Sequence, residues 1–240
     1  MPFRHVLKAL LHRAGVDVVR FTPGSSEGAR VAAMMRAHRV DVVFDIGANS
    51  GQYGRTLRVG GYEGRIVSFE PSTAARCELV KTAKRDRKWD IAEQMALGSE
   101  DNRLELHISG NSVSSSLLPM AELHLSAAPA SAYVGSETVP VRRLDDIAKE
   151  YLRPESIPFM KIDTQGYEAK VLRGASATLD RMAGVQLELS LVPLYVGQST
   201  YEELTEQLKQ RGFALWGLSP AFVDPRTGRL LQVDAAFFRD

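Results

Sequence analysis

Cysteine is almost absent from this chain of 240 residues, because Cys77 is the only one. A lone cysteine excludes an intramolecular disulfide, which fits a cytoplasmic setting. Long hydrophobic runs are missing as well, since no apolar stretch approaches the roughly 20 residues that a membrane-spanning helix requires. We therefore expect a cytoplasmic protein with no transmembrane segment.

The chain also lacks an excess of charge of either sign. Its 30 lysine and arginine residues oppose 29 aspartate and glutamate residues, which leaves a net charge of +1. A protein that binds nucleic acid usually carries a basic surplus, so we expect no nucleic-acid partner. What is present is ordinary for a globular protein, with 44% hydrophobic and 25% charged residues and enough length for one good core.

The first 39 residues predict a helical extension to this core. Phe3, Val6 and Leu10 recur at the spacing of one helical face, but basic residues interrupt them, unlike the continuous apolar stretch of a signal peptide. A second helix is predicted over residues 31–38. The first helix could pack against the body, contact a membrane surface peripherally or mediate formation of an oligomer. Residues 40–240 then form the main domain.

The most informative stretch is Val42–Tyr53. It begins as an apolar run, which indicates a strand buried on both faces of a parallel sheet. Gly47 and Gly51 follow, and a glycine-rich turn after such a strand lets the backbone approach a ligand closely. Asp45, at the end of the strand, suits a ligand with cationic or hydroxyl groups better than bare phosphate. A tight turn without any ligand is the alternative.

A second strand that ends in an acidic residue strengthens the case for a ligand. Arg65–Phe69 predicts another buried strand, and Glu70 follows it, 25 residues after Asp45. In dinucleotide-binding folds, an acidic residue about 20 residues beyond the glycine turn binds a ribose hydroxyl group. The two features together predict a nucleoside site.

Strands alternate with helices along the rest of the chain. This order, with turn residues at Asp224–Gly228 near the end, predicts an α/β sandwich around a mostly parallel seven-stranded sheet with a C-terminal antiparallel β-hairpin. Leu104–Ile108 alternates with period two and predicts an additional strand with one exposed face. The other predicted strands are 89–97, 157–163, 185–191, 213–218 and 231–238.

Residues 109–138 differ in composition from the segments around them. They are rich in serine, alanine and glycine, with Ser114, Ser115 and Ser116 at their centre. A long loop of this kind in a compact domain is usually a lid or a binding loop, or else disordered. We expect it to contact the substrate.

Several of these motifs together resemble one family. Roughly residues 40–217 resemble the FkbM family of S-adenosylmethionine-dependent methyltransferases, which have a Rossmann-like fold. The resemblance implies S-adenosylmethionine as cofactor, S-adenosylhomocysteine as product, and O-methylation of hydroxyl groups on sugars, glycolipids or polyketides. The chain departs from the family at Gln165, where many members carry glutamate. The stretches that carry the resemblance are Phe44–Tyr53, Phe69–Pro71, Ser114–Leu117, Leu144–Asp146 and Lys161–Glu168.

The resemblance also implies a set of cofactor contacts. Residues of the glycine turn would hold the methionine part, and Glu70 would bind both ribose hydroxyl groups. Residues after the second strand would flank the adenine, and residues that end the third strand would contact it. The implied cofactor-binding residues are Asp45, Gly47, Ala48, Asn49, Gly51, Tyr53, Glu70, Pro71, Ser72, Ala96, Leu97 and Asp163.

A base is also needed, because an alcohol must lose its proton during methyl transfer. Asp163, at the end of its strand, is the first candidate, and Glu188, on the polar row of the next strand, is the second. Asp163 could instead cap the following helix, and Glu188 could pair with a buried cation. The predicted substrate contacts are Ser114, Ser115, Ser116, Tyr195 and Gln198.

Two further sets of residues have a weaker case. His107 and His124 each stand alone in the sequence, and a lone histidine is more often a surface or boundary residue. Asp163, Glu168 and Glu188 offer the oxygen ligands that Mg²⁺ prefers. Nothing in the sequence brings three of them around one point, so no metal site is predicted.

An O-methyltransferase is therefore the leading hypothesis. An NAD-dependent oxidoreductase fits less well, because Gly47 and Gly51 lack the middle glycine of the dinucleotide fingerprint. A cofactor-binding module without catalysis is the non-enzymatic alternative, suggested by Gln165.

Overall fold

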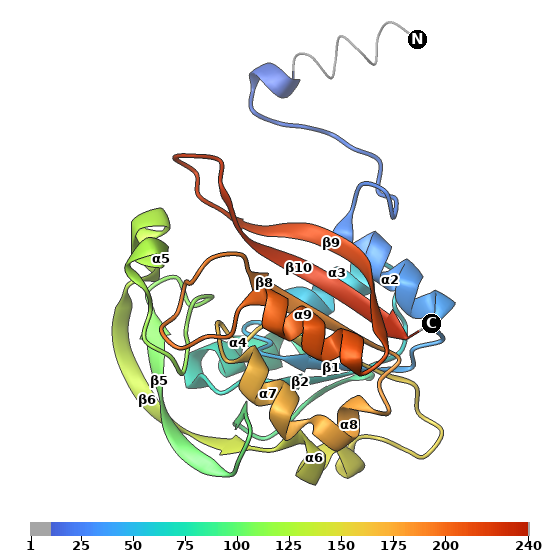
Figure 1. Cartoon of the computed structure of the whole chain (residues 1–240). Helices are drawn as coiled ribbons and strands as arrows, with labels where there is room; N and C mark the ends of the chain where they lie inside the picture. Colours follow the sequence, from blue (N-terminus) through green and yellow to red (C-terminus); the bar gives the residue numbers. More distant parts are fainter. Residues whose placement is uncertain (1–10, 240) are drawn as a thin grey trace, which may run out of the picture.

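The computed structural model describes residues 11–239, and a seven-stranded sheet lies at their centre (Figure 1). Its strands are β1 Val42–Ile46, β2 Arg65–Phe69, β3 Trp89–Ile91, β7 Pro158–Ile162, β8 Gly184–Ser190, β9 Phe213–Val223 and β10 Leu230–Arg239. Their order is β3-β2-β1-β7-β8-β10-β9, and only β10 runs against its neighbours. This architecture confirms the predicted mostly parallel sheet with its C-terminal antiparallel hairpin.

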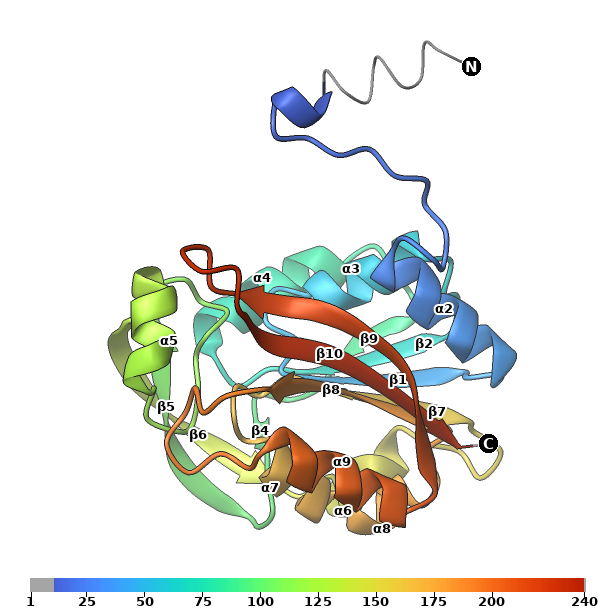
Figure 2. The same cartoon turned by 45° about the horizontal axis from the view of Figure 1, so that its top comes forward.

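Helices cover both faces of the sheet (Figure 2). Val43 of β1 packs towards one helical layer and Phe44 towards the other, and both are fully buried. Burying a side chain of this kind contributes roughly 1.5–3 kcal/mol, which explains why β1 is an unbroken apolar run. Within residues 11–239, no helix combines the length and apolar character that crossing a membrane requires. One layer contains α2 Glu27–Ala37, α3 Gln52–Val59 and α4 Thr73–Ala83, and the other α6 Leu144–Ile147, α7 Glu168–Gly174, α8 Ser176–Leu179 and α9 Tyr201–Gln210.

The helix α2 packs on the sheet as part of the core. The side chain of Ser26 accepts a hydrogen bond from the backbone N–H of Ala29 and so caps the helix. Val31 and Met35 share a buried cluster with Leu57 of α3. Residues 11–25 lead away from the body in Figures 1 and 2. Most of the first predicted helix lies outside the described residues.

A second, smaller sheet stands beside the main one, and the sequence did not predict it. It consists of β4 Ala96–Leu97, β5 Asn102–Ser109 and β6 Tyr133–Arg142, in the order β4-β6-β5. The predicted single strand over 89–97 is therefore wrong, since it divides between the two sheets. Gln94 lies between these two strands, and its side-chain amide donates a hydrogen bond to the backbone O of Pro71.

The prediction of one long loop over residues 109–138 is also wrong in its second half. This segment contains α5 Glu122–Ala127, a 3₁₀ turn at Pro129–Ser131 and the first half of β6. The outer half of β6 is mostly exposed and includes Gly135 and Ser136, so it lacks a strong apolar alternation. Its strand conformation comes from pairing with β5.

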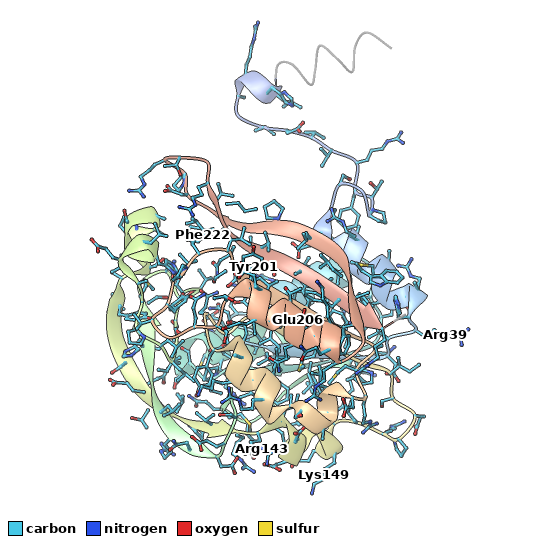
Figure 3. The ribbon with its side chains drawn as sticks, in the orientation of Figure 1. Arg39, Arg143, Lys149, Tyr201, Glu206 and Phe222 are labelled. Carbon is cyan, nitrogen blue, oxygen red and sulfur yellow. The ribbon has the colours of Figure 1, made fainter. Side chains whose placement is uncertain are left out.

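The hairpin of β9 and β10 extends to α5. Figure 3 shows Phe222 at this junction, and its ring centroid lies 5.3 Å from that of His124. Tyr201 and Glu206, also labelled there, are exposed residues of α9. The hairpin and the small sheet thus flank the same end of the main sheet.

Candidate active site

A cavity of about 350 Å³ opens at the carboxyl ends of β1, β2 and β7. Its walls come from these strands, from α2 and α3, and from the small sheet with its loop at residues 112–117. Open α/β sheets bind ligands at this end, and the size suits a small molecule. The predicted site residues that line the cavity are Gly47, Ala48, Asn49, Tyr53, Glu70, Pro71, Ala96, Leu97, Ser115, Ser116 and Asp163.

The turn after β1 requires glycine at two positions. Gly47 has φ +75°, and a Cβ atom there would lie 1.9 Å from the backbone O of Asp163. Gly51 has φ +86°, and a Cβ atom there would lie 3.0 Å from a methyl group of Leu79. Glycine alone adopts such conformations without strain. The turn therefore touches the end of β7 backbone to backbone, which brings Asp163 to the cavity.

Replacing Gly47 by alanine should lower the free energy of unfolding by about 2–4 kcal/mol, because a left-handed φ and an overlap with backbone combine. Gly228→Ala is the matched control, since Gly228 has φ +73° but nothing within 4 Å of an added Cβ. We expect it to lose only about 1–2 kcal/mol. Urea denaturation measures both free energies of unfolding. Equal losses in the two variants would show that the close approach to Asp163 does not contribute to the loss of stability.

Glu70 presents its carboxylate to the cavity at the end of β2. Its Oε2 accepts the backbone N–H of Asn49 at 2.7 Å, and its Oε1 accepts that of Ser72 at 2.8 Å. Burial raises the pKa of Glu70 to about 7, against the lowering effect of the two N–H groups. Each oxygen keeps capacity for a further donor, so the residue fits a ligand with two neighbouring hydroxyl groups.

Asp45 lies behind the cavity wall. It is fully buried, its Oδ2 accepts the hydroxyl of Ser68 at 3.3 Å, and its Oδ1 is 3.6 Å from Nζ of Lys161. Burial raises the pKa of Asp45, and the Lys161 ammonium opposes that rise. Gly51 and Ser72 also lie outside the lining, where Ser72 caps α4. These predicted cofactor residues support the turn and the helix.

Lys161 is a cavity residue that the sequence analysis missed. Its Nζ lies 3.1 Å from Oδ2 of Asp163 and donates to the backbone O of Gly47 at 3.3 Å. Burial opposes its charge, but the carboxylates of Asp163 and Asp45 outweigh burial and raise the pKa of Lys161. The ammonium group therefore stays charged and partly neutralises both acids. Period two along β7 was the available signal, since Lys161 and Asp163 share one face.

The two predicted catalytic residues are joined by Gln165. The Nε2 of Gln165 donates to Oδ1 of Asp163 at 2.8 Å and to Oε2 of Glu188 at 2.6 Å. Oε2 of Glu188 also accepts the side-chain amide of Gln232 at 2.7 Å. Burial, followed by the charge of Asp163, raises the pKa of Glu188 well above its usual range. Asp163 lines the cavity, whereas Glu188 is not one of the lining residues.

A row of polar side chains from α2, β8 and β10 forms one end of the cavity. Gln186 of β8 accepts the hydroxyl of Tyr53 at 2.9 Å and donates to Oε1 of Glu27 at 3.0 Å. Asp234 of β10 lines the same end. Burial raises the pKa of Asp234 to about 7 and also raises that of Glu27. This end thus offers several oxygen atoms that accept hydrogen bonds.

Three of the predicted substrate contacts do not reach the cavity. Ser114 is buried within its own loop. Tyr195 is 1% exposed, and its hydroxyl donates to Oε1 of Gln165 at 2.6 Å. The side chain of Gln198 accepts two backbone N–H groups of the preceding turn. These residues support the site from behind, while Ser115 and Ser116 line it.

The remaining candidates have other partners. His107 stacks on Tyr133, and His124 is buried, which lowers the pKa of His124 to about 4. The carboxylate of Glu168 accepts two backbone N–H groups of its own turn. Across residues 11–239, no group of three histidine, cysteine or acidic residues has an arrangement that could hold a metal ion.

Comparisons with known proteins agree with this architecture. The family model for the methyltransferase FkbM domain matches residues 45–215. A search of curated proteins found no match. Among solved structures, a methyltransferase FkbM from Methylobacillus flagellatus gives a TM-score of 0.53 at 16% identity, over 83% of this chain and 44% of that one. This chain therefore spans less than half of that relative.

Two further structures have lower scores. A TehB-like SAM-dependent methyltransferase from Corynebacterium glutamicum gives 0.41 at 10% identity, over 100% of this chain and 97% of that one. An rRNA methylase from Streptococcus thermophilus gives 0.46 at 10% identity, over 92% and 99%. The Methylobacillus superposition, at 16% identity, bears on the fold alone, which is that of a Rossmann-like methyltransferase.

Proposed function

Since the chain belongs to the FkbM methyltransferase family, we propose that it transfers a methyl group from S-adenosylmethionine to a hydroxyl group of a sugar, glycolipid or polyketide-type acceptor. The family match covers well over half of the chain and implies this cofactor. The acceptor, the cytoplasmic location and the boundary at residue 40 are predictions.

The observation that carries the proposal is the pairing of Glu70 with the glycine turn across one cavity. Glu70 is held by two backbone N–H groups with its oxygens towards the cavity, where they can accept from both ribose hydroxyl groups. The apolar side chains of Phe69, Met95 and Leu97 line the cavity nearby and suit an adenine ring. The residues present therefore fit the cofactor.

Methyl transfer to a hydroxyl group is helped by a base beside that group, and a carboxylate can act as this base. When bound, the cofactor supplies an electrophilic methyl group and a thioether leaving group. With the cofactor bound, a C–O bond to the acceptor would form as the C–S bond broke, and Asp163 would take the proton of the acceptor hydroxyl group. Lys161 and Gln165 hold the two oxygens of Asp163, which fixes the direction of the carboxylate.

The polar end of the cavity supports a hydroxyl-rich acceptor. Glu27, Gln186 and Asp234 place acceptor oxygens where the hydroxyl hydrogens of a sugar could bind. Lys161 is the lining lysine, and acidic groups outnumber it. Lys161 already pairs with Asp45 and Asp163, so this lining suits a neutral acceptor better than a phosphate-bearing one, which supports the expectation of a partner other than nucleic acid.

Incubation of the protein with cell extract and methyl-labelled S-adenosylmethionine tests this function. We expect label in a neutral, hydroxyl-bearing small molecule or glycolipid. Label in RNA would contradict the acceptor class. Absence of label, with S-adenosylhomocysteine still bound in calorimetry, would favour a binding module, and binding of NAD instead would favour an oxidoreductase.

A further inference from the structure

We propose that Gln165 is a positioning residue that holds Asp163 in its reactive orientation and links that orientation to the loop over the cavity. The inference rests on the proposed function, because it gives Asp163 the role of proton acceptor.

The side-chain amide of Gln165 can point in only one direction. Oε2 of Glu188 already accepts the side-chain amide of Gln232, and the hydroxyl of Tyr195 donates to the other end of Gln165, so the NH₂ group faces Asp163 and Glu188. The amide oxygen then faces the hydroxyl of Tyr195, 2.6 Å away. All three contacts are satisfied at once, and Gln165 is only 8% exposed. The arrangement therefore allows a single orientation.

The backbone of Gln165 is as well defined as its side chain. Its φ of +55° is uncommon for a residue other than glycine. The carboxylate of Glu168 accepts the N–H groups of Thr164 and Gly166 on either side, which stabilises this turn. The uncommon conformation of Gln165 is thus stabilised by Glu168, a buried residue that does not line the cavity.

The same residue connects the site to the loop that follows β5. The hydroxyl of Ser116 donates to the backbone O of Gln165 at 2.7 Å. Tyr195, which supports the amide, also lies within 3.4 Å of the backbone O of Ser114. Ser115 and Ser116 line the cavity. A movement of this loop would therefore displace Gln165 and, through its hydrogen bond, change the orientation of Asp163.

A neutral amide suits this position better than an acid would. Gln165 shares its two hydrogens between two carboxylates, so it screens Asp163 from Glu188. A glutamate there would place a third carboxylate against both. It would also lose the two hydrogen bonds that the amide of Gln165 donates. The groups that face Asp163 and its surroundings are Asp45, Lys161, Glu168, Glu188, Tyr195 and Asp234.

Gln165→Glu should lower kcat by roughly 100-fold, as expected for the loss of the hydrogen bond to the Asp163 carboxylate and the arrival of a further carboxyl group beside it. The acidic limb of the pH profile of kcat should move to higher pH, because Asp163 would face an added negative charge. The affinity for S-adenosylhomocysteine, measured by calorimetry, should change less than about threefold, because Glu70 is unchanged. Tyr195→Phe, which removes only the supporting hydroxyl, should give a smaller loss of about tenfold.

Gln210→Glu provides the charge-matched control. Gln210 is exposed on α9, where it donates to Glu206, so this variant should keep the pH profile and kcat of the original chain. A wild-type kcat and an unshifted acidic limb in Gln165→Glu would overturn the proposal. A merely structural role would lower the yield of folded protein without moving the limb.

A second measurement separates this proposal from the proposed function. In the ¹⁵N-labelled full chain bound to S-adenosylhomocysteine, the side-chain NH₂ signals of Gln165 should shift with pH as Glu188, whose pKa is raised by burial, titrates. If no methyl transfer is found in any assay, the proposed function fails, yet this titration still decides whether Gln165 bridges the acids. Signals that stay constant with pH would overturn the bridging role.

Discussion

Asp163→Asn should lower kcat by about 1,000-fold, in the middle of the range that a general base contributes. The acceptor proton would lose the carboxylate that we assign to receive it. Asparagine keeps the size of the side chain, and an oxygen of its amide can still accept from Lys161. Affinity for S-adenosylhomocysteine should therefore change less than about threefold.

Steady-state methyl transfer and calorimetry together measure this split. Asp180→Asn is the control, because Asp180 is an exposed partner of Arg211 and should leave both values unchanged. Near-normal turnover in Asp163→Asn would remove Asp163 as the base. Glu188→Gln would then have to be the variant that loses turnover.

The cofactor half of the site was predictable because its residues are local in sequence. Gly47 and Gly51 lie in one turn, and Glu70 ends the next strand of a parallel sheet. Parallel neighbours in a sheet bring their carboxyl ends together, so strand order alone places Glu70 beside the turn. No long-range packing had to be known.

The acceptor half could not be predicted in this way. Glu27, Gln186 and Asp234 come from an N-terminal helix and two late strands. Gln186 belonged to the polar row recognised on β8, but nothing local indicated that Asp234 lies opposite Glu188 across the β8–β10 pair. That register follows from antiparallel pairing, which sequence patterns specify only through the buried face.

The role of Gln165 could not be predicted from the sequence for a different reason. It lies in a turn, where periodicity carries no information, and its importance comes from partners on β7, β8 and the segment after β8. The small sheet was missed for a related reason, since β6 has few buried residues in its outer half. Both features depend on contacts between segments far apart in sequence.

Glu70→Gln should weaken the binding of S-adenosylhomocysteine by about 100-fold, equivalent to roughly 3 kcal/mol from two hydrogen bonds to a charged group. Glutamine would turn its NH₂ group towards one of the two backbone N–H donors, Asn49 or Ser72, and so would lose one anchor as well. Calorimetry measures the affinity. Glu63→Gln, at an exposed position, is the control that should bind normally.

The pH dependence makes this prediction sharper. Burial raises the pKa of Glu70 from 4.5 to about 7, so the folded protein keeps a proton that the unfolded chain has released. The free energy of unfolding should therefore fall between about pH 4.5 and pH 7, by up to roughly 3 kcal/mol. Glu70→Gln should lack this fall and be the more stable protein at pH 8 without ligand. Ligand affinity of the original chain should rise over the same interval as the carboxylate ionises, and a flat affinity would show that Glu70 does not bind the ribose.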